Sequence, residues 1–579
     1  MDPTFRQLVA AIRDELGALS ALGLANAAWA GAVLGLERWH AWAAAMEAAL
    51  VARPVGEFKE QELTSALWAL AKSEMGSCAA FAPLLQEAWL RLGRMRPNQL
   101  AMLVLAVAEA RVHIPELMID AFEALEAGDG VAQLYSNSAV SVLYALARLS
   151  YAPPEVDGLV AGIVERLLRP EGEQRRPALE SLSPREVGVC VWAMGSIARQ
   201  RLASGRGVEG PVRSLVAALL ARVENLPGTL TPMQLANVAH GAGMAQMSTE
   251  GMLARVERDA LRLSADGALQ PGDMAHVAWA LATLQGSRAS PRFLAALEAQ
   301  LAEGGFLAQS NAYETTLCAW ALVVAGRRRV DVFARVRAHV AELRGFTPEA
   351  LRMLHSLELG LLAPMPAGDD IGVDASDRSG AEVLSLLESQ GQLRVRAYKE
   401  WHRARRQRSQ SVSALQRSVH ATATALFVPQ GVTAGEVVLE HEAEEYSVDV
   451  AVPSRRVAIE VDGPSHWVRD ASSGAIIGPS GATVLKHRLL EEAGWRVASV
   501  GYHHWQAARS GAARCELLAS LLGDALTAPQ PTHREQANII GPEEVAPGSE
   551  DEAAARQKMT AARLLKQSPL KRAVARRRR

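Results

Sequence analysis

One apolar phrase recurs along the N-terminal part of the chain, and it limits the possible folds more than any other feature. Its copies are LANAAWAGAVLGL, LTSALWALAKSEM, AVSVLYALARLSY, EVGVCVWAMGSIA, LANVAHGAGMAQM, MAHVAWALATLQG and TTLCAWALVVAGR. Each copy centres on one ring residue: Trp29, Trp68, Tyr144, Trp192, His240, Trp279 and Trp320. The repeat length is roughly forty residues, with one weaker copy near Leu105 and two insertions, and that length suits one helical hairpin per unit.

A helical hairpin with one apolar face must stack on a neighbour to bury that face, so residues 1–362 are predicted to form an α-solenoid. Hydrophobic residues make up 49% of the chain but aromatic residues only 5%, which favours closely packed helices over a β fold. We expect the rings to pack between repeats. The alternative is that they stack on nucleic-acid bases, with polar first-helix residues reading the base edges: Asn26, Ser65, Asn237 and His276.

The remaining composition excludes several classes of protein. Four cysteines lie far apart without a CxxC pair, which argues against a disulfide framework and a structural zinc site: Cys78, Cys190, Cys318 and Cys515. No run approaches the roughly 20 apolar residues that span a bilayer. Acidic residues within the first twenty positions argue against a signal or transit peptide. A soluble protein without membrane partners is expected.

The charge pattern changes after the repeats. Residues 363–392 include APMPAGDDIGVDASDRSG and are predicted to be a linker. Residues 393–428 are predicted to be a basic helical segment that contacts nucleic acid, because its cations are interleaved with planar groups suited to unpaired bases. The candidate contact residues are Arg394, Arg396, Lys399, Trp401, Arg403, Arg405, Arg406 and Arg408.

Residues 429–527 have a different sequence pattern, which predicts a small α/β domain. The segments VVLEHEA, YSVDVAVP and RVAIEVDG alternate as strands, TVLKHRLLEEAG follows as a helix, and WRVASVGYH and ARCELLASLLGDAL supply a last strand and helix. The predicted order is βββαβα. An acidic and then basic tail at 528–579 is predicted to be disordered.

This domain resembles the RAP domain, a module at the C-termini of organellar RNA-binding proteins. The resemblance rests on a strand that ends in a D-G-P-x-H turn, a Thr and Lys that open a leucine-rich helix, a G-W-x-V strand and a final Trp. These positions are Asp462, Gly463, Pro464, His466, Thr483, Lys486, Leu489, Leu490, Gly494, Trp495, Val497 and Trp505. The repeats likewise resemble octotricopeptide-type repeats and the helical regions of FAST-kinase-like proteins, which share the xxWALAxL phrase.

The order of elements is also similar to that of restriction-endonuclease-like proteins, in which an Asp on one strand and an acid-x-Lys on the next hold a divalent metal. That resemblance implies Asp449, Glu460 and Asp462 as Mg²⁺ ligands, since carboxylates suit this ion. Asp462 stands where the pattern has lysine. Lys486 on the following helix is the candidate replacement, and His466 is the candidate base.

The resemblances imply an RNA-binding protein of mitochondrion or chloroplast that acts in RNA processing, mRNA stability or rRNA maturation. Single-stranded RNA is the expected partner, together with ribonucleoprotein components. His466, Lys486 and Arg488 are further candidate RNA contacts, and RNA binding requires no cofactor. Two alternatives are a Mg²⁺-dependent endoribonuclease that uses the carboxylates, and a HEAT-like protein-binding scaffold.

Overall fold

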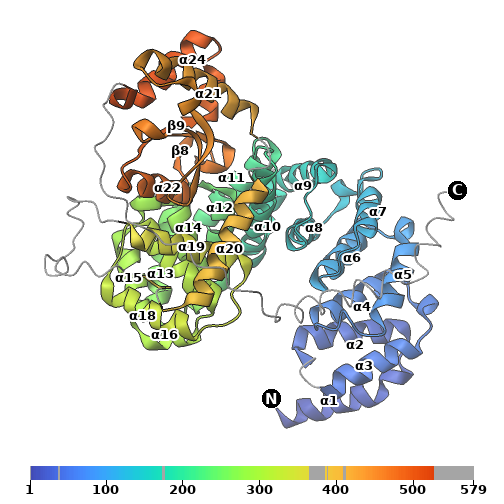
Figure 1. The fold of residues 1–579 in the computed structure, drawn as a ribbon. Coiled ribbons are helices and arrows are strands. Elements are labelled where there is room, and N and C mark those ends of the chain that lie inside the picture. Colours follow the sequence, from blue (N-terminus) through green and yellow to red (C-terminus); the bar gives the residue numbers. More distant parts are fainter. Residues whose placement is uncertain are drawn as a thin grey trace. The chain divides into compact units, whose positions relative to one another are not determined.

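The computed structural model describes residues 2–36, 40–171, 176–363, 385–387, 389–408 and 412–526 (Figure 1). The chain forms two compact units. Among the described residues, the first contains those up to Gln200 together with Glu209–Arg222, and the second contains Arg201–Val208 and those from Val223 to Leu526. Within the described residues, no helix is both long and apolar enough to cross a membrane.

The first unit is a series of helical hairpins that follows helix α1 (Pro3–Glu15). The hairpins are α2 (Ala21–Leu34) with α3 (His40–Ala52), α4 (Glu60–Lys72) with α5 (Phe81–Leu90), α6 (Pro97–Glu109) with α7 (Pro115–Glu126), and α8 (Ser136–Arg148) with α9 (Asp157–Leu168). The first helix of each hairpin packs on the first helix of the next, from α2 through α4 and α6 to α8. Most of α10 (Pro184–Ala203) and α11 (Pro211–Glu224) also belongs to this unit.

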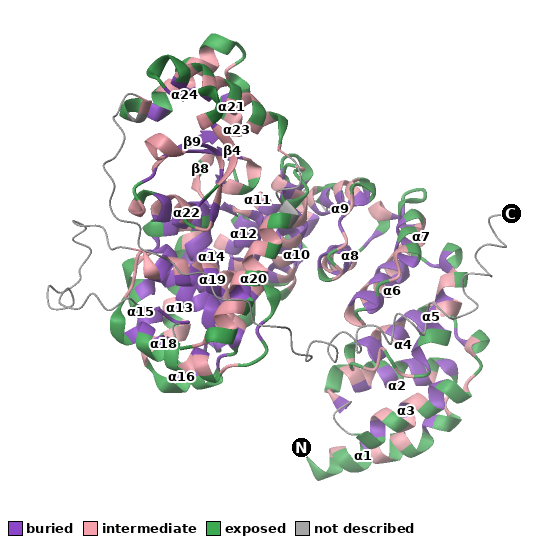
Figure 2. Cartoon of the chain, in the orientation of Figure 1, coloured by how far each residue is buried: buried purple, intermediate pink, exposed green. Residues whose placement is uncertain are grey.

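The second unit continues the same pattern. Its helices are α12 (Pro232–Ala245), α13 (Glu250–Ala265), α14 (Pro271–Gln285), α15 (Pro291–Ala302), α16 (Gly304–Gln309), α17 (Ala312–Val324), α18 (Val330–Glu342), α19 (Pro348–Leu362) and α20 (Gly391–Arg408). The helices α12, α14, α17, α19 and α20 pack in that order. In Figure 2, α14 and α19 are largely buried, whereas α16 and α18 carry exposed faces. The predicted array of helical hairpins is confirmed.

Several hairpins are closed by a contact that the sequence analysis did not anticipate. A cationic or imidazole side chain on the second helix binds a backbone carbonyl in the loop before the first helix. The observed pairs include Arg91 Nη1 to Phe58 O at 2.7 Å, Arg166 Nε to Leu134 O at 2.9 Å, Arg255 Nη1 to Leu226 O at 2.9 Å and His339 Nε2 to Ser310 O at 3.1 Å. These bonds satisfy loop carbonyls that the fold withdraws from water.

The ring residues of the repeated phrase differ from our expectation. Only Trp320 among them is buried, at 5% exposure, whereas Trp29 is 47% exposed and the other five are intermediate. Three pairs of them touch between neighbouring repeats: Trp29 with Trp68, Tyr144 with Trp192, and His240 with Trp279. The helix cores are instead built from the small and aliphatic residues around each ring, such as Leu67 and Leu70, both at most 1% exposed.

The α/β module lies in the second unit and is built on a four-stranded sheet. Its strands are β4 (Val438–Ala443), β5 (Tyr446–Val452), β6 (Val457–Asp462) and β9 (Arg496–Gly501), in the order β4-β5-β6-β9. The first two pairings are antiparallel and β6 pairs with β9 in parallel. Helices α21 (Ala414–Phe427) and α24 (Gly511–Leu522) supply residues to the core on one face, and α22 (Gly481–Glu492) supplies Leu490 to the core on the other. The short α23 (Tyr502–Ala507) carries buried Trp505.

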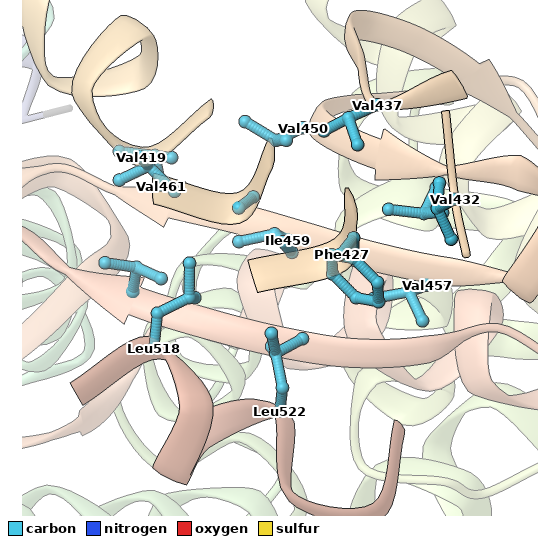
Figure 3. Close-up of a cluster of buried hydrophobic side chains, with 14 of the residues drawn as sticks. Val419, Phe427, Val432, Val437, Val450, Val457, Ile459, Val461, Leu518 and Leu522 are labelled. Carbon is cyan, nitrogen blue, oxygen red and sulfur yellow. The ribbon is translucent and has the colours of Figure 1, made fainter. Parts of the chain in front are cut away.

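The module begins earlier than the predicted boundary at 429. Val419, Ala423 and Phe427 on α21 are fully buried in the sheet core, and Figure 3 shows Val419 and Phe427 there. Their spacing of four residues places them on one helix face. The predicted basic segment 393–428 is therefore two helices with different partners, α20 against α19 and α21 under the sheet. Residues 364–384 of the predicted linker and 527–579, which include the predicted tail, lie outside the described residues.

The sequence analysis also missed a hairpin that joins the module to the repeats. Strands β7 (Trp467–Asp470) and β8 (Ile476–Pro479) pair with each other, and β7 pairs in parallel with β3 (Met247–Ser248) from the loop between α12 and α13. Helix α22 packs on α14, α17 and α19. The boundary between the two compact units therefore falls within the predicted solenoid 1–362. The second half of the repeats belongs to the same compact unit as the α/β module.

The close approach of α22 to the repeats predicts the effect of a single methyl group. A Cβ on Gly481, the first residue of α22, would lie 2.2 Å from the carbonyl oxygen of Ala282 on α14. We expect Gly481→Ala to destabilise the second unit by about 1–3 kcal/mol, because the backbone would have to shift. The matched control is Gly511→Ala at the first residue of α24, where a Cβ meets nothing within 4 Å. Urea unfolding measures both, and equal stability of the two variants would contradict this packing.

Candidate nucleic-acid interface

Helix α20 ends the layer of first helices and has two different faces. Its inner face carries fully buried Ala397 and half-buried Trp401. Glu400 links the helix to α19 by an ion pair with Arg352 at 3.0 Å. Within the described residues, no first helix of a following repeat packs on the outer face. A terminal repeat needs a polar outer face to stay in solution, so polarity here is expected.

The outer face is not merely polar, because it carries one sign of charge. Between residues 396 and 406, the residues classed as exposed are all cations: Arg396, Lys399, Arg403 and Arg406. Their spacing of three and four residues puts them on one side of the helix. Arg403 forms an ion pair with Glu400 at 3.0 Å. We name these four residues the cationic stripe, and it spans about 15 Å along the helix axis.

The other basic-segment candidates have internal roles. Trp401 Nε1 donates to Glu445 O at 3.0 Å, and Arg405 Nη1 donates to the same oxygen at 2.6 Å. Arg394 is half-buried and its charge acts on Glu358 and Glu445. These three residues therefore fasten α20 to the β4–β5 turn and to α19. The side chain of Arg408 lies outside the described residues.

The carboxylates of strand β6 point toward α22, as their two-residue spacing predicts. Glu460 is 1% exposed, and its Oε2 lies 2.5 Å from Lys486 Nζ. Lys486 also donates to Ser447 O at 2.7 Å. Burial raises the pKa of Glu460 to about 7, against the pull of Lys486 in the opposite direction. Lys486 thus supplies a cation from the following helix.

Asp462 forms a second pair, with His466. Its Oδ1 lies 2.6 Å from His466 Nδ1, and Ser499 Oγ donates to its other oxygen. Burial acts to raise the pKa of Asp462, but the hydrogen bonds from His466 and Ser499, together with the charge of His466, lower the pKa overall. For His466, burial acts to lower the pKa, and the bond to Asp462 raises it overall. The His466 side chain is 39% exposed, so this imidazole is accessible to a ligand.

Asp449 is used by the sheet itself. Ladder pairing between β5 and β6 runs only from Val452 to Val450, and beyond that point Asp449 Oδ2 accepts from Val461 N at 2.7 Å. Its Oδ1 accepts from Gln416 Nε2 at 2.7 Å. The carboxylate therefore replaces a missing backbone partner.

The three carboxylates do not fit a shared magnesium ion. Each is bound to its own protein partners, namely Asp449 to Val461 and Gln416, Glu460 to Lys486, and Asp462 to His466 and Ser499. Across the described part of the chain, no group of three or more His, Cys, Asp or Glu residues is arranged to hold a metal ion. We therefore derive no metal-dependent step from this site.

The turn after β6 is held from both sides. His466 O accepts from Ser480 N at 2.8 Å and from Thr483 Oγ1 at 3.4 Å, so the Thr that opens α22 fixes the turn. Gln246 Nε2 from the repeats donates to Ser465 O at 2.7 Å. Arg488, a predicted RNA contact, donates to Val324 O at 3.2 Å and so binds the end of α17. Its guanidinium is occupied by the repeat array.

Two partner residues were missed by sequence reasoning. Ser499 lies opposite Glu460 in the β6–β9 register, so strand alternation would have placed it on the carboxylate face. Gln416 stands near the start of α21, far from the strands in sequence, and no local pattern indicates its contact with Asp449.

The raised pKa of Glu460 predicts a pH dependence of stability. Because folding favours the protonated acid, the wild-type protein should lose stability as pH rises from 4.5 to about 7. Glu460→Gln mimics the protonated form and should flatten this part of the profile, by an amount on the order of a few kcal/mol at neutral pH. Thermal unfolding between pH 4.5 and 8 measures it. Glu444→Gln, at an exposed hairpin position, is the control; parallel profiles for wild type and Glu460→Gln would contradict the prediction.

Comparisons with known proteins agree with the geometry of this module. A family model described as RAP domain matches residues 459–519. A protein of Oryza sativa subsp. japonica, named RAP domain-containing protein, chloroplastic, is 31% identical over 84 residues. That match covers 14% of this chain and 12% of the rice protein, so the similarity is confined to a short part of each. The strand, turn and helix at residues 459–519 match the RAP domain, so the chain contains a RAP domain in this segment.

Proposed function

We propose that this protein binds single-stranded RNA in an organelle and acts in RNA processing, stability or rRNA maturation. The observation that carries the proposal is the cationic stripe of Arg396, Lys399, Arg403 and Arg406 on the exposed face of α20. The RAP domain and the chloroplastic name of the rice relative support the RNA partner and the organelle. Such binding requires no cofactor.

The stripe suits a phosphate backbone for an electrostatic reason. Four cations at intervals of three and four residues form a line on one helix face, and each phosphate that a cation neutralises releases condensed counterions. Acidic side chains on the same helix would weaken this effect. Within Gly391–Arg408 the acid is Glu400, which is only 12% exposed and is bound to Arg352 and Arg403.

The RAP domain is proposed to add a second contact near His466. This imidazole is accessible, and Asp462 holds its Nδ1, which leaves Nε2 as the atom that faces a ligand. Lys486 lies in the same region but is bound to Glu460 and to Ser447 O. We therefore assign His466 to direct RNA contact and Lys486 to the support of the site.

Neutralising the stripe tests the function. The variant with Arg396, Lys399, Arg403 and Arg406 all replaced by Gln should bind single-stranded RNA more weakly, and the slope of log affinity against log salt should fall in magnitude by about 3. Fluorescence anisotropy across a salt series measures both quantities.

A charge-matched control separates the stripe from net charge. Replacing Arg258, Arg292, Arg335 and Arg337 by Gln removes four exposed cations from the second helices α13, α15 and α18. We expect a much smaller change in the slope. Equal slopes for the two quadruple variants would show that RNA does not recognise the stripe.

The two alternatives make different predictions. An endoribonuclease would cleave RNA in Mg²⁺ or Mn²⁺, and Glu460→Ala would abolish cleavage. The separately engaged carboxylates do not support that alternative. A HEAT-like protein scaffold would show no RNA affinity at any salt concentration.

A further inference from the structure

Apart from buried Trp320, the rings of the repeated phrase lie on an accessible face of the first helices. In the first unit, Trp29 and Trp68 have ring centroids 6.4 Å apart, and Tyr144 and Trp192 have centroids 5.5 Å apart. Trp29 is 47% exposed, and the other three are intermediate. Each pair joins one repeat to the next while leaving ring surface open to solvent.

This exposure is unusual for residues that could have been core. Leu67 and Leu70, next to Trp68 in sequence, are at most 1% exposed, so the fold has a buried face available on the same helix. The rings instead occupy the same accessible position in four repeats of this unit, as two neighbouring pairs separated by the repeat around Leu105. Exposed rings do not improve the solubility of a solenoid. Large apolar patches on a protein surface usually mark a binding site.

The charges beside the rings indicate the kind of partner. Lys72 and Arg148 lie four residues after Trp68 and Tyr144, one helical turn away on the same face, and both are exposed. Tyr144 also has Glu109 as a neighbour, bonded to its side chain. Planar rings beside cations suit a ligand that is both aromatic and anionic. A single-stranded nucleic acid has both properties.

We propose that the rings Trp29, Trp68, Tyr144 and Trp192 form a stacking platform for the bases of single-stranded RNA, with Lys72 and Arg148 beside its phosphates. This inference rests on the proposed function and adds to it a second site, on the first unit. The rings would contact the planes of the bases, whereas the cationic stripe would contact the phosphates. A stacking platform tolerates sequence differences, because every base has a π-face.

The experiment compares base-bearing and base-free ligands on the full chain. The probes are an oligoadenylate and a chain of the same length with abasic ribose phosphates. Wild-type protein should bind the oligoadenylate more tightly, and Trp68→Leu with Tyr144→Leu should reduce that preference by about tenfold or more. Binding of the abasic chain should be unchanged. Trp29→Leu, which alters the most exposed ring, should reduce the preference in the same direction and serves if the double variant unfolds.

The control is Trp89→Leu, which removes a ring of intermediate exposure from the second helix α5. It should leave the preference for bases unchanged. The inference is overturned if the wild-type protein binds both probes equally, or if the ring variants keep the wild-type preference; salt-dependent binding through the cationic stripe would then still support the proposed function. If wild-type protein binds neither probe at any salt concentration, the proposed function fails and the platform fails with it.

Discussion

The packing of each first helix on the next is the interaction on which the rest of the second unit depends. One hairpin cannot bury its apolar face alone, so α12, α14, α17 and α19 form a continuous layer. That layer supplies the surface on which α22 packs and the end on which α20 packs. Among the described residues, α20 is the last helix of this layer, and the cationic stripe lies on its uncovered outer face.

The same layer makes the RAP domain part of a larger body. Gly481 lets α22 approach the backbone of α14, and the β3–β7 pair adds backbone hydrogen bonds between a repeat loop and the turn region of the domain. Gln246 holds the carbonyl of Ser465, next to His466. The position of the accessible imidazole is therefore set partly by the repeats. A structural change in the repeats of the second unit should therefore alter the position of His466 through these contacts.

The cost of burying charge explains why Asp449, Glu460 and Asp462 each have their own protein partners. A buried carboxylate without partners costs several kcal/mol, and each of the three found a separate solution. Asp449 completes the sheet, Glu460 pairs with a lysine from the next helix, and Asp462 orients a histidine. The resemblance to nucleases implied these residues as ligands, but the local sequence carries no information about such competing partners.

Local patterns determined much of this protein from sequence alone. The recurring phrase predicted the helical hairpins, and the alternation of VVLEHEA, YSVDVAVP and RVAIEVDG predicted strands β4, β5 and β6 to within a residue or two. Both follow from periodicities that act over a few residues. The D-G-P-x-H turn and the Thr that opens α22 located the RAP domain.

Only the tertiary structure decided which side chains are available. Arg403, Arg405 and Arg406 are the same residue type within four positions of α20. Arg405 nevertheless binds the β4–β5 turn, whereas Arg403 and Arg406 face solvent. The rings looked like core residues and lie on an accessible face, and the β7–β8 hairpin forms against a loop more than two hundred residues earlier. Exposure and long-range pairing depend on which surfaces meet after folding. Local composition does not encode these long-range contacts. The sequence therefore determined the helices and strands, and the tertiary structure determined which side chains are exposed for binding.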